Sequence, residues 1–212
     1  MNTQSRRQFL KQAPVGAIIA VIAGRALAAD AGKDKSTIEN LTATLEARAN
    51  GEARYAAFAK KADEEGYTQV GSLFRASAKA EKINREDLEK VLKKLGATPK
   101  VTAQAPEVKS TKDNLAAALK LVNEEHDDKL PDAISKARSE KNKEALRAFN
   151  YCKNSQTEQV TLFEDAGANL EKWKGGTKVI YVCEVCGLTV LALPDEKCPS
   201  CLEPIAKFVK VS

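Results

Sequence analysis

Hydrophobic residues recur at three- and four-residue spacing over two long stretches of the chain, which is the pattern of amphipathic helices. The first stretch covers 36–95 and is interrupted at Gly66. The second begins at about Thr111, restarts at about Asn142 and runs to roughly residue 172. Between them, 96–111 contains two prolines and small polar residues, which are typical of a linker. The pattern therefore predicts two helical pairs joined by one long connection.

The two helical stretches resemble each other. Identical residues recur 75 positions later, and these are Lys61, Ala62 and Phe74 in the first half and Lys136, Ala137 and Phe149 in the second. Four helices in two pairs, joined by a long crossover, make the ferritin-like form of the four-helix bundle. We therefore expect a mainly α protein with a ferritin-like bundle over 36–174 and a crossover at 96–111.

The end of the chain, 177–212, predicts a separate small metal-binding domain. Two Cys-x-x-Cys pairs lie there with eleven residues between them, and their members are Cys183, Cys186, Cys198 and Cys201. Each pair offers two sulfurs to one metal, so two pairs complete a tetrahedron. Short strands are expected around 179–182, 189–191 and 207–211. A domain this small has little apolar core, so we expect the metal to hold it together.

Three chemistries are compatible with four such cysteines. Iron gives a one-electron carrier, whereas zinc gives a redox-silent structural site with the same ligands. Two disulfides are the third alternative, because an oxidising compartment favours them. The fifth cysteine, Cys152, is expected to pack as a small buried hydrophobe, with a disulfide-linked dimer as the alternative.

Charge is informative mainly about the N-terminus. The whole chain has a net charge of +5, but its first 28 residues carry four basic residues and no acid. The remainder is close to neutral with interspersed signs, so we expect no nucleic-acid partner.

The first 28 residues have the order of an export signal. Arg6 and Arg7 precede Phe-Leu-Lys, an apolar run spans 13–23, and a small-x-small sequence ends at Ala28. The paired arginines resemble the twin-arginine signal of bacterial proteins that are exported already folded. We expect cleavage after Ala28, a flexible mature start at 29–35, a periplasmic location and no membrane attachment after cleavage. Retention as an anchor is the alternative.

Four segments of the mature sequence are characteristic: Arg54 to Ala59, Glu65-Gly66-Tyr67, Ala80-Glu81-Lys82 and the cysteine-rich tail. In these segments the mature sequence resembles the rubrerythrin family, and its tail is similar to a rubredoxin-like domain. The resemblance implies a ferritin-like bundle with a di-iron centre. It also implies a homodimer in which the tail iron of one chain approaches the bundle of the other.

The expected ligand positions depart from the family pattern. The family uses glutamates from two helices and a Glu-x-x-His pair from each of the other two. The matching positions here are Arg48, Glu81, Asn84, Glu125, Gln156 and Gln159. Amides are poor iron ligands, and the changes make the site more positive. We therefore expect a metal-free polar core and no di-iron centre.

These observations predict a periplasmic electron-transfer protein with one rubredoxin-type iron and an unidentified redox partner protein. A rubrerythrin-like peroxidase with a residual bundle metal site is one alternative, so whether the chain is an enzyme stays open. A zinc-stabilised structural or binding protein is the other.

Overall fold

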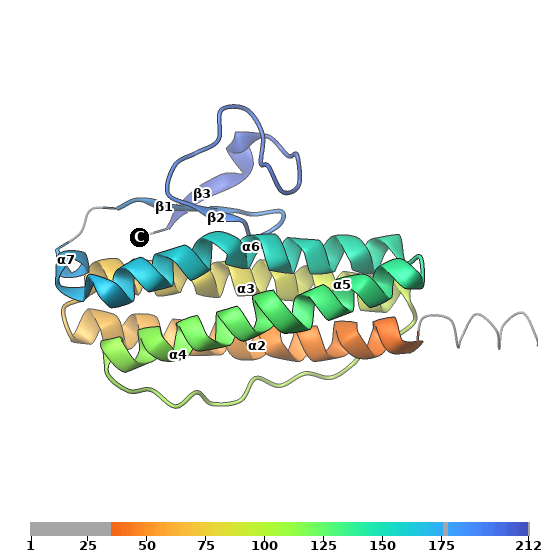
Figure 1. Ribbon diagram of the computed structural model, residues 1–212, viewed down its shortest axis with the longest axis horizontal. Coiled ribbons are helices and arrows are strands. Elements are labelled where there is room, and N and C mark those ends of the chain that lie inside the picture. Colours follow the sequence, from red (N-terminus) through yellow and green to blue (C-terminus); the bar gives the residue numbers. More distant parts are fainter. Residues whose placement is uncertain (1–34, 176–177, 212) are drawn as a thin grey trace, which may run out of the picture. The chain divides into compact units, whose positions relative to one another are not determined.

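The computed structural model describes residues 35–175 and 178–211 (Figure 1). The expected signal peptide and nearly all of the expected flexible start lie outside the described residues. The chain from Ser36 onward forms one structural unit. No helix in the described part of the chain is both long enough and apolar enough to cross a membrane.

The first helical pair consists of α2 (Lys35–Glu64) and α3 (Thr68–Lys94). The turn between them contains Gly66 at a φ of 80°, which a residue without Cβ adopts at little cost. Two backbone hydrogen bonds close the turn, at 3.0 Å from Gly66 N–H and at 2.7 Å from Tyr67 N–H. This is the break that the hydrophobic pattern predicted.

The connection after α3 runs along the bundle, and Gln104 N–H donates to the Asn50 side chain of α2 at 2.8 Å (Figure 1). It leads into the second half of the bundle. The elements there are α4 (Thr111–Glu124), the π-helix η1 (Glu125–Lys129), α5 (Leu130–Ser139), α6 (Lys143–Ala168) and the short α7 (Leu170–Lys174). Asn142 caps α6 by accepting from Ala145 N–H at 3.0 Å. The π turn was not predicted from the sequence.

The bundle contains two apolar clusters, one toward each end. In one, the Phe74 ring lies 5.4 to 6.1 Å, centroid to centroid, from the rings of Tyr55, Phe58 and Phe163. The other contains Leu41, Leu45, Leu88, Leu92 and Phe149. The helices α2, α3 and α6 each contribute to both clusters. Between the two contributions of these helices lie buried polar residues, which include Arg48, Glu81, Asn84, Gln156 and Gln159. The interior therefore has a polar layer enclosed by apolar packing.

The tail forms a small antiparallel sheet in the order β2-β1-β3. Its elements are β1 (Ile180–Cys183), β2 (Thr189–Val190), the 3₁₀ helix η2 (Ile205–Lys207) and β3 (Phe208–Val211). The strands fall where the sequence placed them. Ile180 and Val182 are fully buried and belong to the same apolar cluster as Phe74, so the sheet packs on the bundle through β1, above α3 and α6 (Figure 1).

Candidate metal centre and the polar layer of the bundle

The four tail cysteines converge on one point. Their sulfurs all lie within 4.8 Å of one another, with 3.7 Å between Cys183 and Cys201 and 3.6 Å between Cys186 and Cys198. Metal–sulfur bonds of about 2.3 Å in a tetrahedron require sulfur–sulfur edges of about 3.8 Å. All five cysteines of the chain are free thiols in the structure. The geometry therefore fits one tetrahedral metal ion, and it differs from a disulfide, whose sulfurs are about 2.05 Å apart.

Two short turns place these sulfurs. In the first, Gly187 N–H donates to Cys183 O at 2.9 Å, and in the second, Leu202 N–H donates to Cys198 O at 2.8 Å. Each turn ends in a left-handed residue directly after its second cysteine, with φ of 76° at Gly187 and 64° at Leu202. Gly187 adopts this conformation at little cost, because it has no Cβ. The second turn instead places a leucine in a conformation that disfavours side chains.

The protonation of the thiols differs within the cluster. A hydrogen bond with the Cys186 thiol, helped by backbone N–H groups of Val185 and Cys186, lowers the pKa of Cys183 to about 5. The shared hydrogen bond with Cys183, followed by burial, raises the pKa of Cys186, and burial raises the pKa of Cys201 to about 12. Thiolates are the metal-binding form. Metal binding at this site therefore releases protons from the thiols that are protonated in the free protein.

The centre of the bundle holds a buried arginine between two carboxylates. Arg48 is 1% exposed and Glu81 is 3% exposed, and Nη1 of Arg48 lies 3.2 and 3.1 Å from the two carboxylate oxygens of Glu81. Nη2 forms an ion pair with Glu125. Gln156 then donates to the same Glu125 carboxylate at 2.8 Å. These four residues, from four different elements, form one connected network.

The other two expected residues connect the polar layer with the tail. Asn84 donates to the Ser155 hydroxyl at 2.7 Å, and Gln159 is 3.5 Å from the Thr189 hydroxyl of β2. A Cβ added to Gly187 would lie 3.1 Å from both the Asn84 amide nitrogen and the Ala80 carbonyl oxygen. The Cys183–Gly187 turn therefore rests directly on α3.

The π-helix η1 explains the position of Glu125. Its wider turn closes with a hydrogen bond from Leu130 N–H to Glu125 O, which adds one residue to the helix between the buried Val122 and Leu130. Lys153 of α6 donates to the carbonyl of His126 at 2.7 Å. π turns of this kind are frequent at functional sites.

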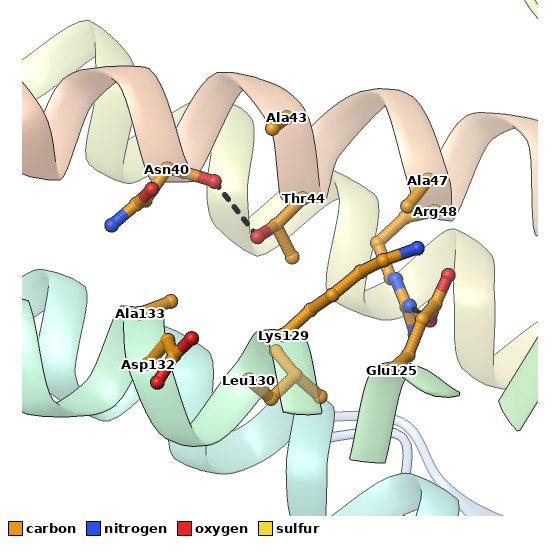
Figure 2. A pocket seen from close by; sticks show the side chains of 10 residues that line it. All are labelled: Asn40, Ala43, Thr44, Ala47, Arg48, Glu125, Lys129, Leu130, Asp132 and Ala133. Carbon is orange, nitrogen blue, oxygen red and sulfur yellow. Dashed lines mark hydrogen bonds and ion pairs between the residues drawn. The ribbon is translucent and has the colours of Figure 1, made fainter. Parts of the chain in front are cut away.

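A pocket of about 270 Å³ opens between α2 and the η1–α5 segment (Figure 2). Arg48 and Glu125 form its polar wall, and the side chain of Lys129 is extended along it. Ala43, Ala47, Leu130 and Ala133 supply most of the apolar lining. The pocket gives the polar layer a route to solvent. Periodicity in the sequence gave no signal for it, because its walls come from two segments far apart in the chain.

The fifth cysteine, Cys152, and the single histidine, His126, lie outside the cysteine cluster. Cys152 is fully buried, and burial raises its pKa to about 12. The His126 ring contacts Asp127 at 2.7 Å and the Thr157 hydroxyl at 3.3 Å. Within the described residues, the four tail cysteines are the one group of three or more Cys, His, Asp or Glu side chains placed to share a metal. In the polar layer, the carboxylates of Glu81 and Glu125 are both paired with the guanidinium of Arg48.

A ferritin-like bundle followed by a four-cysteine tail defines a class of protein, and comparisons agree with it. The rubrerythrin family model matches residues 39–159. The chain is 31% identical to nigerythrin of Nitratidesulfovibrio vulgaris over 174 residues, covering 82% of this chain and 85% of that protein. It is 32% identical to rubrerythrin-2 of Clostridium acetobutylicum over 151 residues, covering 70% and 82% of the two chains. The chain belongs to the rubrerythrin family.

Solved structures give the same result. A mixed-valence structure of nigerythrin matches with a TM-score of 0.76 and 28% identity, over 82% of this chain and 86% of that one. A bacterioferritin of Mycobacterium tuberculosis matches with a TM-score of 0.60 at 15% identity, over 66% and 92% of the two chains, which supports the fold alone. The predicted fold class and the predicted family are confirmed. Family and cysteine cluster together support a rubredoxin-like iron site in the tail.

Proposed function

We propose that this protein is a one-electron carrier whose single metal centre is the iron site formed by the tail cysteines. In this proposal the bundle holds no di-iron centre and is not the site of peroxide chemistry. The observation that carries the proposal is the buried guanidinium of Arg48, which contacts Glu81 and Glu125 inside the bundle.

The choice of iron over zinc rests on the family and on the surroundings of the sulfurs. A relative of similar fold, nigerythrin, has a structure described as fully reduced and all ferrous. When bound, iron supplies reversible one-electron chemistry at a four-sulfur site. The residues of this chain hold the sulfurs at tetrahedral spacing and bury Cys183, Cys186 and Cys198 to 1% exposure or less. Cys201 is half-buried, which makes its side of the centre the natural place for an electron to enter or leave.

The choice against a di-iron centre rests on charge. Two iron ions need several anionic ligands, and the polar layer supplies two carboxylates, both paired with Arg48. Gln156 directs its NH₂ group toward Glu125, so its donor side occupies the position where a carboxylate ligand would be needed. Amide groups bring no charge and bind iron weakly.

Export and assembly complete the proposal. The Arg6-Arg7 pair and the sequence ending at Ala28 support a twin-arginine signal and a periplasmic location. Family resemblance supports a homodimer, and a carrier needs a redox partner protein. Expression in a strain without the twin-arginine translocase tests the location. The protein should then accumulate uncleaved in the cytoplasm, and normal export through another route would contradict the assignment.

The decisive experiment measures iron and zinc per chain on protein purified after native export, together with the visible spectrum and peroxide-driven reoxidation. We expect one iron, no zinc and the absorption of a ferric thiolate centre. Three irons per chain would overturn the proposal in favour of a peroxidase, and one zinc would favour a structural protein. Cys198→Ser is the matched control, since it should remove the visible absorption without changing the bundle.

A further inference from the structure

Leu202 is the most exposed large hydrophobic side chain in the described part of the chain, at 71%. Its backbone is left-handed, with a φ of 64°, and this conformation disfavours any residue with a Cβ. The equivalent residue after the first cysteine turn is Gly187, which adopts the same conformation without that cost. Leu202 therefore combines an unfavourable backbone conformation with a side chain that the folded chain does not bury.

The position of Leu202 is beside the metal centre. It directly follows Cys201, which is the least buried of the four cysteines. Two backbone hydrogen bonds close the turn, from Leu202 N–H to Cys198 O at 2.8 Å and from Cys198 N–H to Glu203 O at 2.7 Å. Pro199 on the same turn is exposed as well. The apolar surface beside the most accessible sulfur is therefore preformed, which lowers the cost of binding a partner there.

Acidic side chains flank this turn. Glu203 follows the exposed leucine, and the carbonyl of Glu196 accepts a hydrogen bond at 3.1 Å from the first residue of η2, which fixes it next to the turn. Asp195 is the third acid of the segment 191–204, and Lys197 is its one base, so the segment has a net charge of −2. The three acids are exposed and form no ion pair with any described residue. Their charge is therefore available to a partner.

We propose that Leu202 and Pro199, flanked by Glu196 and Glu203, form the docking surface for the redox partner protein. The partner that fits this surface presents an apolar patch ringed by basic side chains, because opposite charges steer two proteins together and set their orientation. Four thiolates around one iron ion also carry a net negative charge, which adds to the attraction. This inference rests on the electron-carrier proposal, since it names the kind of partner that reaches the same metal centre.

The test uses two one-electron acceptors of opposite charge. Cytochrome c is a basic protein whose haem edge is surrounded by lysines, and ferricyanide is a small anion. The reduced, iron-loaded protein is mixed with each acceptor, and the second-order rate constant is measured by stopped flow as the ferrous centre gives one electron to the ferric acceptor. Between about 0.01 and 0.15 M salt, where screening shortens from roughly 30 to 8 Å, the cytochrome c rate should fall about tenfold. A cytochrome c rate that does not fall with salt would overturn the proposal.

Leu202→Gly tests the apolar contact. Because glycine accepts the left-handed backbone, the turn should fold at least as well as in the wild type. We expect the ratio of the cytochrome c rate to the ferricyanide rate to fall about fivefold to tenfold. The ratio is the readout because a change in the potential of the centre affects both acceptors in the same direction. An unchanged ratio would overturn the proposal.

Two further variants are controls for this result. Leu202→Met keeps an apolar side chain of similar size, so its ratio should stay near that of the wild type. Val108→Gly removes an exposed hydrophobic side chain from the crossover, where Val108 is 43% exposed, and should leave the ratio unchanged. A loss in Val108→Gly as large as that in Leu202→Gly would contradict a specific role for Leu202.

Glu203→Gln tests the charge at the rim. It should reduce the salt dependence of the cytochrome c rate, because one attractive charge is lost. Glu107→Gln is the matched control, since Glu107 is exposed on the crossover and pairs there with Lys109. It should retain the salt dependence of the wild type. Equal effects of the two substitutions would overturn the placement of the docking surface at the cysteine turn.

Binding is measured separately by sedimentation at low salt with both proteins oxidised, so that no electron moves. The wild type should form a complex with cytochrome c, and Leu202→Gly should form much less of it. A wild-type dimer that becomes monomeric in Leu202→Gly would overturn the proposal and assign the surface to a second copy of this chain. A centre that ferricyanide cannot oxidise would overturn the electron-carrier proposal itself. Normal oxidation by ferricyanide, with a cytochrome c rate indifferent to salt and to Leu202→Gly, would overturn the docking surface alone.

Discussion

Replacing Arg48 by methionine tests whether the bundle depends on its internal positive charge. The change keeps most of the side-chain volume but leaves the carboxylates of Glu81 and Glu125 without their partner. Removing one member of a buried ion pair costs about 3–5 kcal/mol. Glu125 retains access to the pocket, so its carboxylate can be hydrated. We therefore expect about 3 kcal/mol, most of it from Glu81, and a fall in Tm of about 6–12 °C.

The pH dependence of this loss identifies its cause. Burial raises the pKa of Glu81, and the Arg48 charge partly opposes that shift. Removing Arg48 therefore raises the pKa further. A carboxyl whose pKa is higher in the folded state loses stability as pH rises from the unfolded to the folded pKa. The deficit of Arg48→Met should be larger at pH 8 than at pH 5.

The assay is unfolding by guanidinium chloride, monitored by the helical circular dichroism signal, because the helices form the bundle. Arg85→Met is the control, since Arg85 forms ion pairs with Glu52 and Glu89 at the surface, which are worth about 0–1 kcal/mol. Adding Glu81→Gln to Arg48→Met should restore most of the lost stability. A single variant no less stable than the control, or a double variant with no recovery, would refute the reasoning.

Three further changes probe the tail and the helix ends. Gly187→Ala should lower the stability of the tail, measured by hydrogen exchange, by about 2–4 kcal/mol, because a Cβ there would lie 3.1 Å from atoms of α3. Gly96→Ala is the control, since Gly96 has a similar φ of 78° but open space around it, and it should cost only about 1–2 kcal/mol. Cys198→Ser should abolish metal binding measured by elemental analysis while helical circular dichroism stays unchanged. Glu140→Gln should lower stability by about 0.5–1 kcal/mol near neutral pH. Hydrogen bonds from Ser36 and Thr37 lower the pKa of Glu140. The stability difference between the wild type and Glu140→Gln should therefore vanish as pH falls through the folded-state pKa of Glu140. A stability difference that stays constant with pH would contradict this prediction.

The helical pattern and the cysteine spacing were sufficient to predict the long helices and the four-cysteine tail. Apolar spacing placed the long helices because each one contributes a continuous stripe to the interior. The 75-residue offset placed Phe74 and Phe149 in equivalent positions, and each lies in one of the two apolar clusters. The four tail cysteines converge because their turns are local, so nearby residues determine the geometry.

The features that the sequence did not predict depend on contacts between distant segments. The π turn at η1 is compatible with ordinary helical spacing on either side, so the hydrophobic pattern did not indicate it. The helix α6 ends at Ala168 and not near residue 172, because Asn169 interrupts it before α7. The contact between Gln159 and Thr189 joins two elements 30 residues apart, and no periodicity reports such a pairing.

The polar layer has a consequence for how the tail is held. Asn84 and Gln159 are two of the positions for which the family resemblance predicted metal ligands, and both lie beside the first cysteine turn. Amides serve this role better than charged groups, because they donate and accept without adding charge near a sulfur-ligated metal. A histidine or a carboxylate at either position could bind an interior ion or contact the tail, but not both. The bundle interior therefore supports the tail with neutral contacts and confines its charges to the Arg48 network, one turn of helix away from Asn84.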